Sequence, residues 1–343
     1  MTLIADPPTG TDGPVLPTAR GPLSAAVLAA LRGDPPAFPD VSLDVDAYGE
    51  DVQLSLYCLY ELHYRGFAGV SDDLEWNPAL LGFRVVLERR FLDALRRDVT
   101  PSDDVDAELA ELLVEPVDAR GVSHFLQRDG ALWQFREYVA HRSLYHLKEA
   151  DPQAWVIARL DGAAKAGLVT VEHDEYGAGD PDRMHSALFA TMMDALGLDS
   201  AYGAYLDVAP SQTLAEVNFM SVCGLHRALR GALIGQFAAV ELTSSPGSHR
   251  LVRAMQRMGV DEAATDFYAE HIEADAVHEQ LVRREVIAPL LRGEPGLAAD
   301  VVFGIRASGF LADRSEALLL TRWADGRPSL PRLGAEGAAP SPS

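Results

Sequence analysis

The residues best suited to chemistry lie in one stretch near the C-terminal end, which the pattern predicts to be a helix. At about 100° per residue, Asp275 follows His271 by four positions and His278 follows it by seven, so the three side chains point into one sector of roughly 60°. Two imidazoles and a carboxylate on one face can bind a transition metal. A polar, solvated helix face is the alternative for these three residues taken alone.

Glu149 lies at a junction between two predicted helices. One helix runs over 131–147, and the next begins at Asp151-Pro152, because aspartate caps a helix and proline suits its first position. A carboxylate at the C-terminal end of a helix opposes the helix dipole, and a cation is one group that would compensate for this.

Three further candidates follow along the chain. Glu175 ends a predicted helix over 153–175, and His185 faces inwards in the first turns of the next helix. Glu241 lies in an apolar segment, where an ionised carboxylate would need a partner if it were buried; exposure at the surface is the alternative. The candidate site residues are therefore Glu149, Glu175, His185, Glu241, His271, Asp275 and His278.

Carboxylates and imidazoles without thiolates suit iron or manganese better than structural zinc. Helical bundles can bring such residues together from facing helices. The paired Glu-x-x-His signature of ferritin-type sites is absent, since Glu137 precedes His141 by four residues. Glu61 and His63 have no obvious partner ligand nearby and are interpreted as structural or pocket-lining.

Composition excludes several classes of protein. The 343 residues carry a net charge of -22, whereas nucleic acids and anionic membrane surfaces require a basic footprint, so neither is expected as a partner. The two cysteines, Cys58 and Cys223, are expected to be buried thiols in a reducing compartment. No leader or membrane span is expected, which predicts a cytoplasmic protein.

The apolar spacing predicts an all-α protein. Residues 1–40 are expected to form a flexible extension without helix, 41–325 a single helical domain, and 326–343 a disordered tail. Helices are expected over 51–64, 79–97, 103–113, 131–147, 153–175, from 180 onwards, and over 214–242, 248–258, 262–291 and 301–321.

Several short motifs in this order resemble those of the haem-oxygenase-like diiron oxidases and oxygenases, often labelled iron-containing redox enzymes. The resemblance covers about residues 130 to 290 and implies a haem-oxygenase-like bundle of about seven core helices, with extra helices before it. It further implies that the seven candidate residues bind two non-haem Fe²⁺ ions. The motifs are Lys148-Glu-Ala-Asp-Pro152, Asp174-Glu-Tyr-Gly177, Arg183-Met-His185, Glu241 and His271-x3-Asp275-x2-His278.

The resemblance implies an enzyme that uses O₂ and an external electron donor to oxidise a small organic substrate. His278 resembles the additional histidine of the N-oxygenating members, which favours oxidation of an amine or guanidine nitrogen in specialised metabolism. Desaturation or C–C cleavage of an amino acid or fatty acid is the alternative. A self-sacrificing oxidant and a non-catalytic helical interaction protein also stay open, as does a homodimer.

Overall fold

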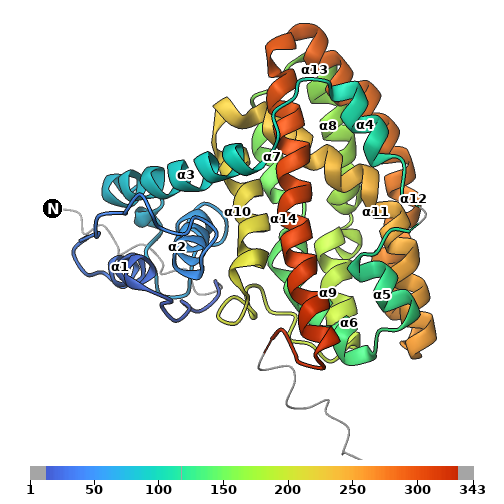
Figure 1. The fold of residues 1–343 in the computed structure, drawn as a ribbon, viewed down its shortest axis with the longest axis horizontal. Coiled ribbons are helices and arrows are strands. Elements are labelled where there is room, and N and C mark those ends of the chain that lie inside the picture. The colour runs from blue at the N-terminus through green and yellow to red at the C-terminus, as the bar shows by residue number, and fades with distance from the viewer. Residues whose placement is uncertain (1–12, 117, 331–343) are drawn as a thin grey trace, which may run out of the picture.

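The computed structural model describes residues 13–116 and 118–330, apart from the side chains of residues 262, 263 and 273–276. These residues form helices and no strand, as the all-α prediction requires (Figure 1). The α-helices are α1 (Pro22–Leu31), α2 (Glu50–Glu61), α3 (Pro78–Asp98), α4 (Val105–Leu112), α5 (Val122–Arg128), α6 (Leu132–His146), α7 (Asp151–Ile157), α8 (Gly162–Glu175), α9 (His185–Ala195), α10 (Ser211–Leu225), α11 (Arg230–Met258), α12 (Asp266–Leu281), α13 (Ala288–Gly293) and α14 (Ala298–Ala324).

The long helices α11 and α14 pack against each other within the bundle, and α1, α2 and α3 lie at one side of it (Figure 1). The two long helices approach closely at Gly235, where an added Cβ would lie 1.9 Å from the carbonyl oxygen of Val301. By length and hydropathy, the segment Pro295–Ala324 would also pass for a membrane span. In the structure it packs on α11 as the core helices of bundles do.

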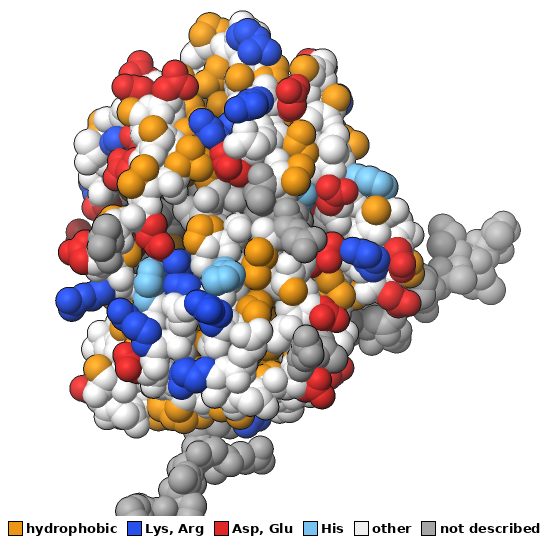
Figure 2. Space-filling model, turned by 90° about the vertical axis from the view of Figure 1, so that its right-hand side faces the viewer, with side chains coloured by type: hydrophobic (Ala, Val, Ile, Leu, Met, Phe, Trp, Pro, Cys, Tyr) orange, Lys and Arg blue, Asp and Glu red, His pale blue; other side chains and the backbone are white. Residues whose placement is uncertain are grey.

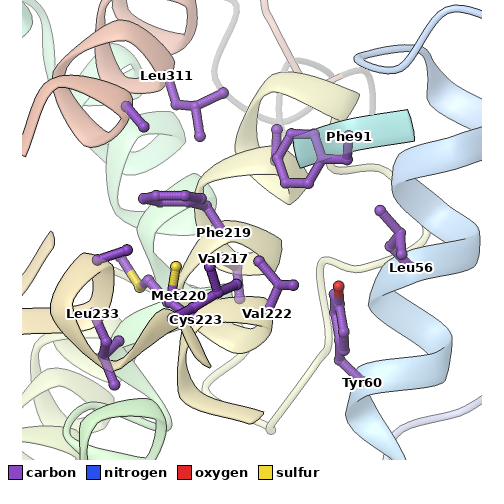
Figure 3. Packing of buried hydrophobic residues seen from close by; sticks show 14 of the residues in the cluster. Leu56, Tyr60, Phe91, Val217, Phe219, Met220, Val222, Cys223, Leu233 and Leu311 are labelled. Carbon is purple, nitrogen blue, oxygen red and sulfur yellow. The ribbon is translucent and has the colours of Figure 1, made fainter. Parts of the chain in front are cut away.

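Helix α10 connects the N-terminal helices to the bundle. Its apolar side chains lie between Leu56 and Tyr60 of α2 on one side and Leu233 of α11 on the other (Figure 3). Phe219 and Val222 of α10 are almost fully buried in this core. The N-terminal helices are therefore part of the same hydrophobic core as the bundle.

Two predicted helices are wrong in their continuity. The helix expected over 153–175 is divided into α7 and α8, and Gly162 at the start of α8 has a φ of 54°. The side chain of Arg159, between the two helices, donates hydrogen bonds to the carbonyls of Gly224 and Leu225 at the end of α10. The helix expected over 214–242 breaks near His226, whose Nε2 lies 3.0 Å from Glu88 Oε2. Apolar spacing alone records neither break.

Other boundaries also differ from the predictions. Helix α11 runs without a break from Arg230 to Met258, so it joins the later part of the segment expected as 214–242 to the one expected as 248–258, with Pro246 inside it. The helix expected over 262–291 is divided into α12, a π-helical segment η6 (Val282–Ile287) and α13. A proline within a helix removes one backbone hydrogen bond but is tolerated when packing holds both sides.

The expectation that residues 1–40 hold no helix is wrong for α1. Pro22 occupies the start of this helix, and Val27 and Leu28 are fully buried, so burial stabilises a segment that composition alone assigns to an extension. At the other end, Leu330 is also fully buried, and its backbone N–H donates to Glu137 Oε1. Residues 326–330 are thus ordered, and residues 331–343 lie outside the described residues.

Candidate metal centre

Glu149 lies between α6 and α7, in the short segment that the sequence analysis placed at a helix junction. The next residue, Ala150, has a φ of 75°, which is a left-handed conformation that costs a residue with a Cβ roughly 1–2 kcal/mol. Such strain persists only where the surrounding structure requires it, and it is often found beside functional groups. Here it turns the chain so that the Glu149 side chain points into the bundle, where it is 7% exposed.

Glu175 is the last residue of α8, and His185 is the first residue of α9. The chain reverses between them at Gly177, which has a φ of 69° and whose Cβ, if present, would lie 2.6 Å from the backbone nitrogen of Met184. Only glycine fits this turn. The reversal places His185 Nδ1 2.7 Å from Glu175 Oε2, with both side chains buried.

His271 and His278 project from α12, as their spacing predicted, and Glu241 projects towards them from α11. All three are buried: His271 and Glu241 are 6% exposed and His278 is fully buried. The alternative of a solvated helix face for the histidines is therefore wrong, as is surface exposure for Glu241. Asp275 belongs to the same helix, but its side chain lies outside the described residues.

Two groups of side chains converge closely enough to bind metal ions. Glu149, Glu175, His185 and His271 form the first ligand group, and Glu175, Glu241 and His278 form the second ligand group. Within each group the ligand atoms lie within 4.8 Å of one another. Glu175 belongs to both groups, since its Oε2 lies 2.7 Å from His185 Nδ1 and its Oε1 lies 3.4 Å from His278 Nδ1.

The donors of the first ligand group fit a metal ion. His271 donates from Nδ1 to the carbonyl oxygen of Phe267 at 2.7 Å, which leaves Nε2 with a lone pair directed towards Glu149 Oε1 at 3.8 Å. Among the described residues, the buried Glu149 Oε2 has no hydrogen-bond partner. Atoms coordinating one ion at about 2.1 Å lie roughly 3–4 Å apart, which is the spacing of these donors.

A chain of polar contacts orients Glu149 from the side away from His271. His146 donates from Nδ1 to Glu149 Oε1 at 2.7 Å, and its Nε2 accepts from Arg142 Nε at 3.3 Å. Arg142 in turn pairs with Glu216 at 3.2 Å. Burial lowers the pKa of His146 to about 4, so the imidazole is neutral and its tautomer is fixed by these two contacts.

The same neighbours keep Glu149 ionised. Burial acts to raise the pKa of Glu149, but the imidazoles of His146 and His271 outweigh it and hold that pKa well below its usual range. His146 was not among the residues predicted from the sequence to belong to the site. Its position three residues before Glu149, near the end of a helix, was the available signal.

Lys148, beside Glu149, forms a buried ion pair with a residue of α2. Its Nζ lies 2.9 Å from Glu61 Oε2 and 4.0 Å from the ring centre of Tyr64. Glu61 also accepts from the hydroxyl of Tyr202 at 2.7 Å. Glu61 therefore lies outside both ligand groups, in agreement with its interpretation as a structural residue.

The second ligand group has a different surrounding. His278 Nδ1 lies 3.1 Å from Glu241 Oε2 and 3.4 Å from Glu175 Oε1, and its Nε2 lies 3.4 Å from Asp174 Oδ2. The side chain of Asp174 is 48% exposed. Directly after α12 the chain forms the π-helical segment η6, a form of helix that occurs often at functional sites.

A cavity of about 880 Å³ reaches both ligand groups, and Glu149, Glu175, Glu241 and His271 line it. Its other walls carry the acids Glu111, Glu115, Glu216, Glu279, Asp313 and Glu316 and the bases Arg120, Arg142 and Arg250. Two of these bases are already paired, Arg142 with Glu216 and Arg250 with Glu115. On the face of the molecule that includes α5 and α12, basic and histidine side chains gather near the middle with acidic ones around them (Figure 2).

A helical bundle with buried carboxylate and imidazole groups around a cavity is characteristic of metal-dependent redox proteins. The chain belongs to the iron-containing redox enzyme family, whose model matches residues 136–312. It is also 26% identical, over 287 residues, to the nitrosourea synthase of Streptomyces achromogenes subsp. streptozoticus. The aligned part covers 78% of this chain and 60% of that protein, so the chain spans less than two thirds of the length of this relative.

Proposed function

We propose that this protein is a non-haem diiron oxygenase that uses O₂ to oxidise the nitrogen of a small amine or guanidine. The observation that carries the proposal is the sharing of Glu175 between two buried ligand groups. A carboxylate that faces two ions can bridge them, and the remaining donors are the carboxylates and imidazoles that iron accepts. Asp275, one turn after His271, is proposed as a further ligand from the sequence alone, because its side chain lies outside the described residues.

Two ferrous ions bound in this way would supply electrons for the reduction of O₂. The side chains of this protein would bind the ions and exclude water from them. His271, oriented by the Phe267 carbonyl, and Glu149, oriented by His146, would hold the first ion. The rings of Phe189 and Phe267 pack against each other and against His146, which excludes water from this side.

The cavity walls support an amine or guanidine over a fatty acid. A fatty acid requires a long apolar channel, whereas the acids that line this cavity outnumber its bases, and the arginines Arg142 and Arg250 are neutralised by partners. Glu316 and Asp313 on α14 are placed to attract a cationic group. The name of the related nitrosourea synthase also refers to a product that carries oxidised nitrogen.

In the proposed reaction an N–H group becomes N–OH, and one oxygen atom of O₂ enters the product. The second oxygen atom leaves as water, which requires two electrons and two protons. An external electron donor supplies these electrons, because the described residues offer only two buried thiols, Cys58 and Cys223. Burial raises the pKa of both thiols, which makes them poor redox groups.

The test is anaerobic loading with Fe(II), followed by rapid mixing with O₂ in the presence of amines, guanidines, amino acids or fatty acids. We expect two ions per chain and a transient visible absorption band whose decay accelerates with an amine or guanidine. Mass spectrometry with isotopically labelled O₂ should then find one labelled oxygen on nitrogen.

Other results would redirect the assignment. Acceleration by a fatty acid, with an alkene or a shortened product, would favour desaturation or C–C cleavage. Consumption of O₂ for a single turnover, with a modified side chain in the protein, would indicate a self-sacrificing oxidant. Absence of iron uptake would leave a helical interaction protein.

A further inference from the structure

Glu172 is a buried acid that neither ligand group includes. It lies on α8 three residues before Glu175, so the two side chains project from neighbouring positions on one face of the helix. Leu168 and Glu175 share this buried face, and Glu172 is only 2% exposed. The sequence analysis did not single it out, because it lies outside the motifs that indicated the other carboxylates.

The surroundings of Glu172 differ from those of other buried acids. Among the described residues, neither of its carboxylate oxygens has a hydrogen-bond partner. By contrast, Glu137 accepts hydrogen bonds from Trp323 and Ser329, and Glu61 accepts them from Lys148 and Tyr202. A buried carboxyl group without a partner is costly, and each such group in a native structure calls for an explanation such as a bound ion.

The charged groups around Glu172 belong mainly to the second ligand group. Its electrostatic neighbours are Glu175, Glu241 and His278, together with Asp151. Asp151 already accepts a hydrogen bond from the Tyr176 hydroxyl at 3.0 Å. A cation held by the second ligand group would therefore be the natural partner of the free carboxyl group.

We propose that Glu172 is an additional ligand of the metal ion bound by Glu175, Glu241 and His278. The proposal rests on the proposed function, because it requires that this group holds iron. The Glu-x-x-Glu spacing lets two carboxylates from one helix reach the same region, since residues three apart are neighbours on a helix. The proposal requires rotation about the side-chain bonds of Glu172, because its carboxylate is not among the ligand atoms that lie within 4.8 Å of one another.

Two substitutions separate coordination from charge. Glu172→Gln keeps the shape and removes the charge, and Glu172→Asp keeps the charge and shortens the reach. We expect both variants to bind the second Fe(II) with an affinity roughly 10- to 100-fold lower, which is the loss of affinity that follows removal of groups around a metal. Asp151→Asn is the matched control, because it removes a neighbouring charge and can still accept from Tyr176.

The measurement is an anaerobic Fe(II) titration with Mössbauer and near-infrared magnetic circular dichroism spectra, which report the number of bound ions and the coordination of each. Thermal unfolding without iron checks the fold, and Glu172→Gln should melt close to the wild-type temperature, because the two side chains have the same shape. Altered spectra of the second ion in both Glu172 variants, with Asp151→Asn unchanged, would support the proposal.

Two results would overturn it. Wild-type titrations and spectra in both Glu172 variants would show that Glu172 does not coordinate, while leaving the diiron proposal intact. Weaker binding of the second ion in Glu172→Gln and Asp151→Asn, but not in Glu172→Asp, would show that Glu172 acts only through its charge and does not coordinate the ion. A wild-type protein that binds no iron would instead remove the proposed function itself.

Discussion

The two ligand groups share Glu175 but differ in how their other members are held. In the first group, His271 is fixed by the Phe267 carbonyl and Glu149 by His146, and all these side chains are buried. In the second group, His278 contacts Asp174, which is half exposed. One of its neighbours, Glu172, has no hydrogen-bond partner among the described residues. A site whose ligands are fixed in advance binds with less loss of conformational entropy, so the first group should bind its ion more tightly.

Replacement of the shared residue should have the largest effect. Glu175→Ala removes a donor from both groups, so we expect less than one iron per chain and a loss of turnover of at least about 100-fold. Iron analysis after anaerobic loading checks this. Glu270→Gln, at the surface of α12 where Glu270 pairs with Arg183, is the control and should keep both ions. Two tightly bound ions in Glu175→Ala would show that the groups are independent.

A matched pair of histidine variants tests the difference between the groups. His271→Ala should remove the first ion, and His278→Ala should spare the fold and leave about one ion per chain, because each deletes one imidazole from a different group. Circular dichroism and iron analysis on both variants provide the measurement. A wild-type iron count and rate in His278→Ala would contradict its assignment as a ligand.

Removal of the metal should proceed in two phases. With a ferrous chelator under anaerobic conditions, we expect the ion of the second group to leave first, because its surroundings reach solvent through Asp174. Release followed by chelator absorbance, with Mössbauer spectra at intermediate times, would identify which ion remains. Loss of both ions in one phase would indicate that the groups bind with similar strength.

The smallest effect is expected for Asp174→Asn. The carboxylate lies 3.4 Å from His278 Nε2 and orients the imidazole, but it is 48% exposed, so solvent weakens its influence. We expect the second ion to bind a few-fold more weakly, within about 1 kcal/mol, and the first ion to be unaffected. An equal effect on both ions in the same titration would show that the contact does not distinguish the groups.

The sequence was sufficient for the parts of the site that follow from helical spacing. His271 and His278 project together because seven residues make nearly two turns, and the proline after Asp151 located the junction at Glu149. The end of a helix at Glu175 was also predicted, and the structure has α8 end there. These features depend on residues close in the chain, whose geometry is set by the backbone.

Other features of the site depend on distant residues and could not be predicted. The side chain of Arg159 donates to carbonyls at the end of α10, and no local pattern records that contact. The left-handed conformation of Ala150, which is unusual for alanine, likewise has no signal in the neighbouring residues. Whether Glu172 has a hydrogen-bond partner is likewise decided by the other helices, not by its neighbours in sequence.

The ion pair between Glu61 and Lys148 joins the N-terminal helices to the segment that holds Glu149. The family match covers residues 136–312, but α2, which supplies Glu61, lies before it. A truncated chain without α1–α3 would lose Glu61 together with the rings of Tyr57 and Tyr64 that cover Lys148, and it would expose the apolar face of α10 that packs on α2. The N-terminal helices therefore set a lower limit on the size of an autonomous catalytic unit, one that is larger than the region shared with the family.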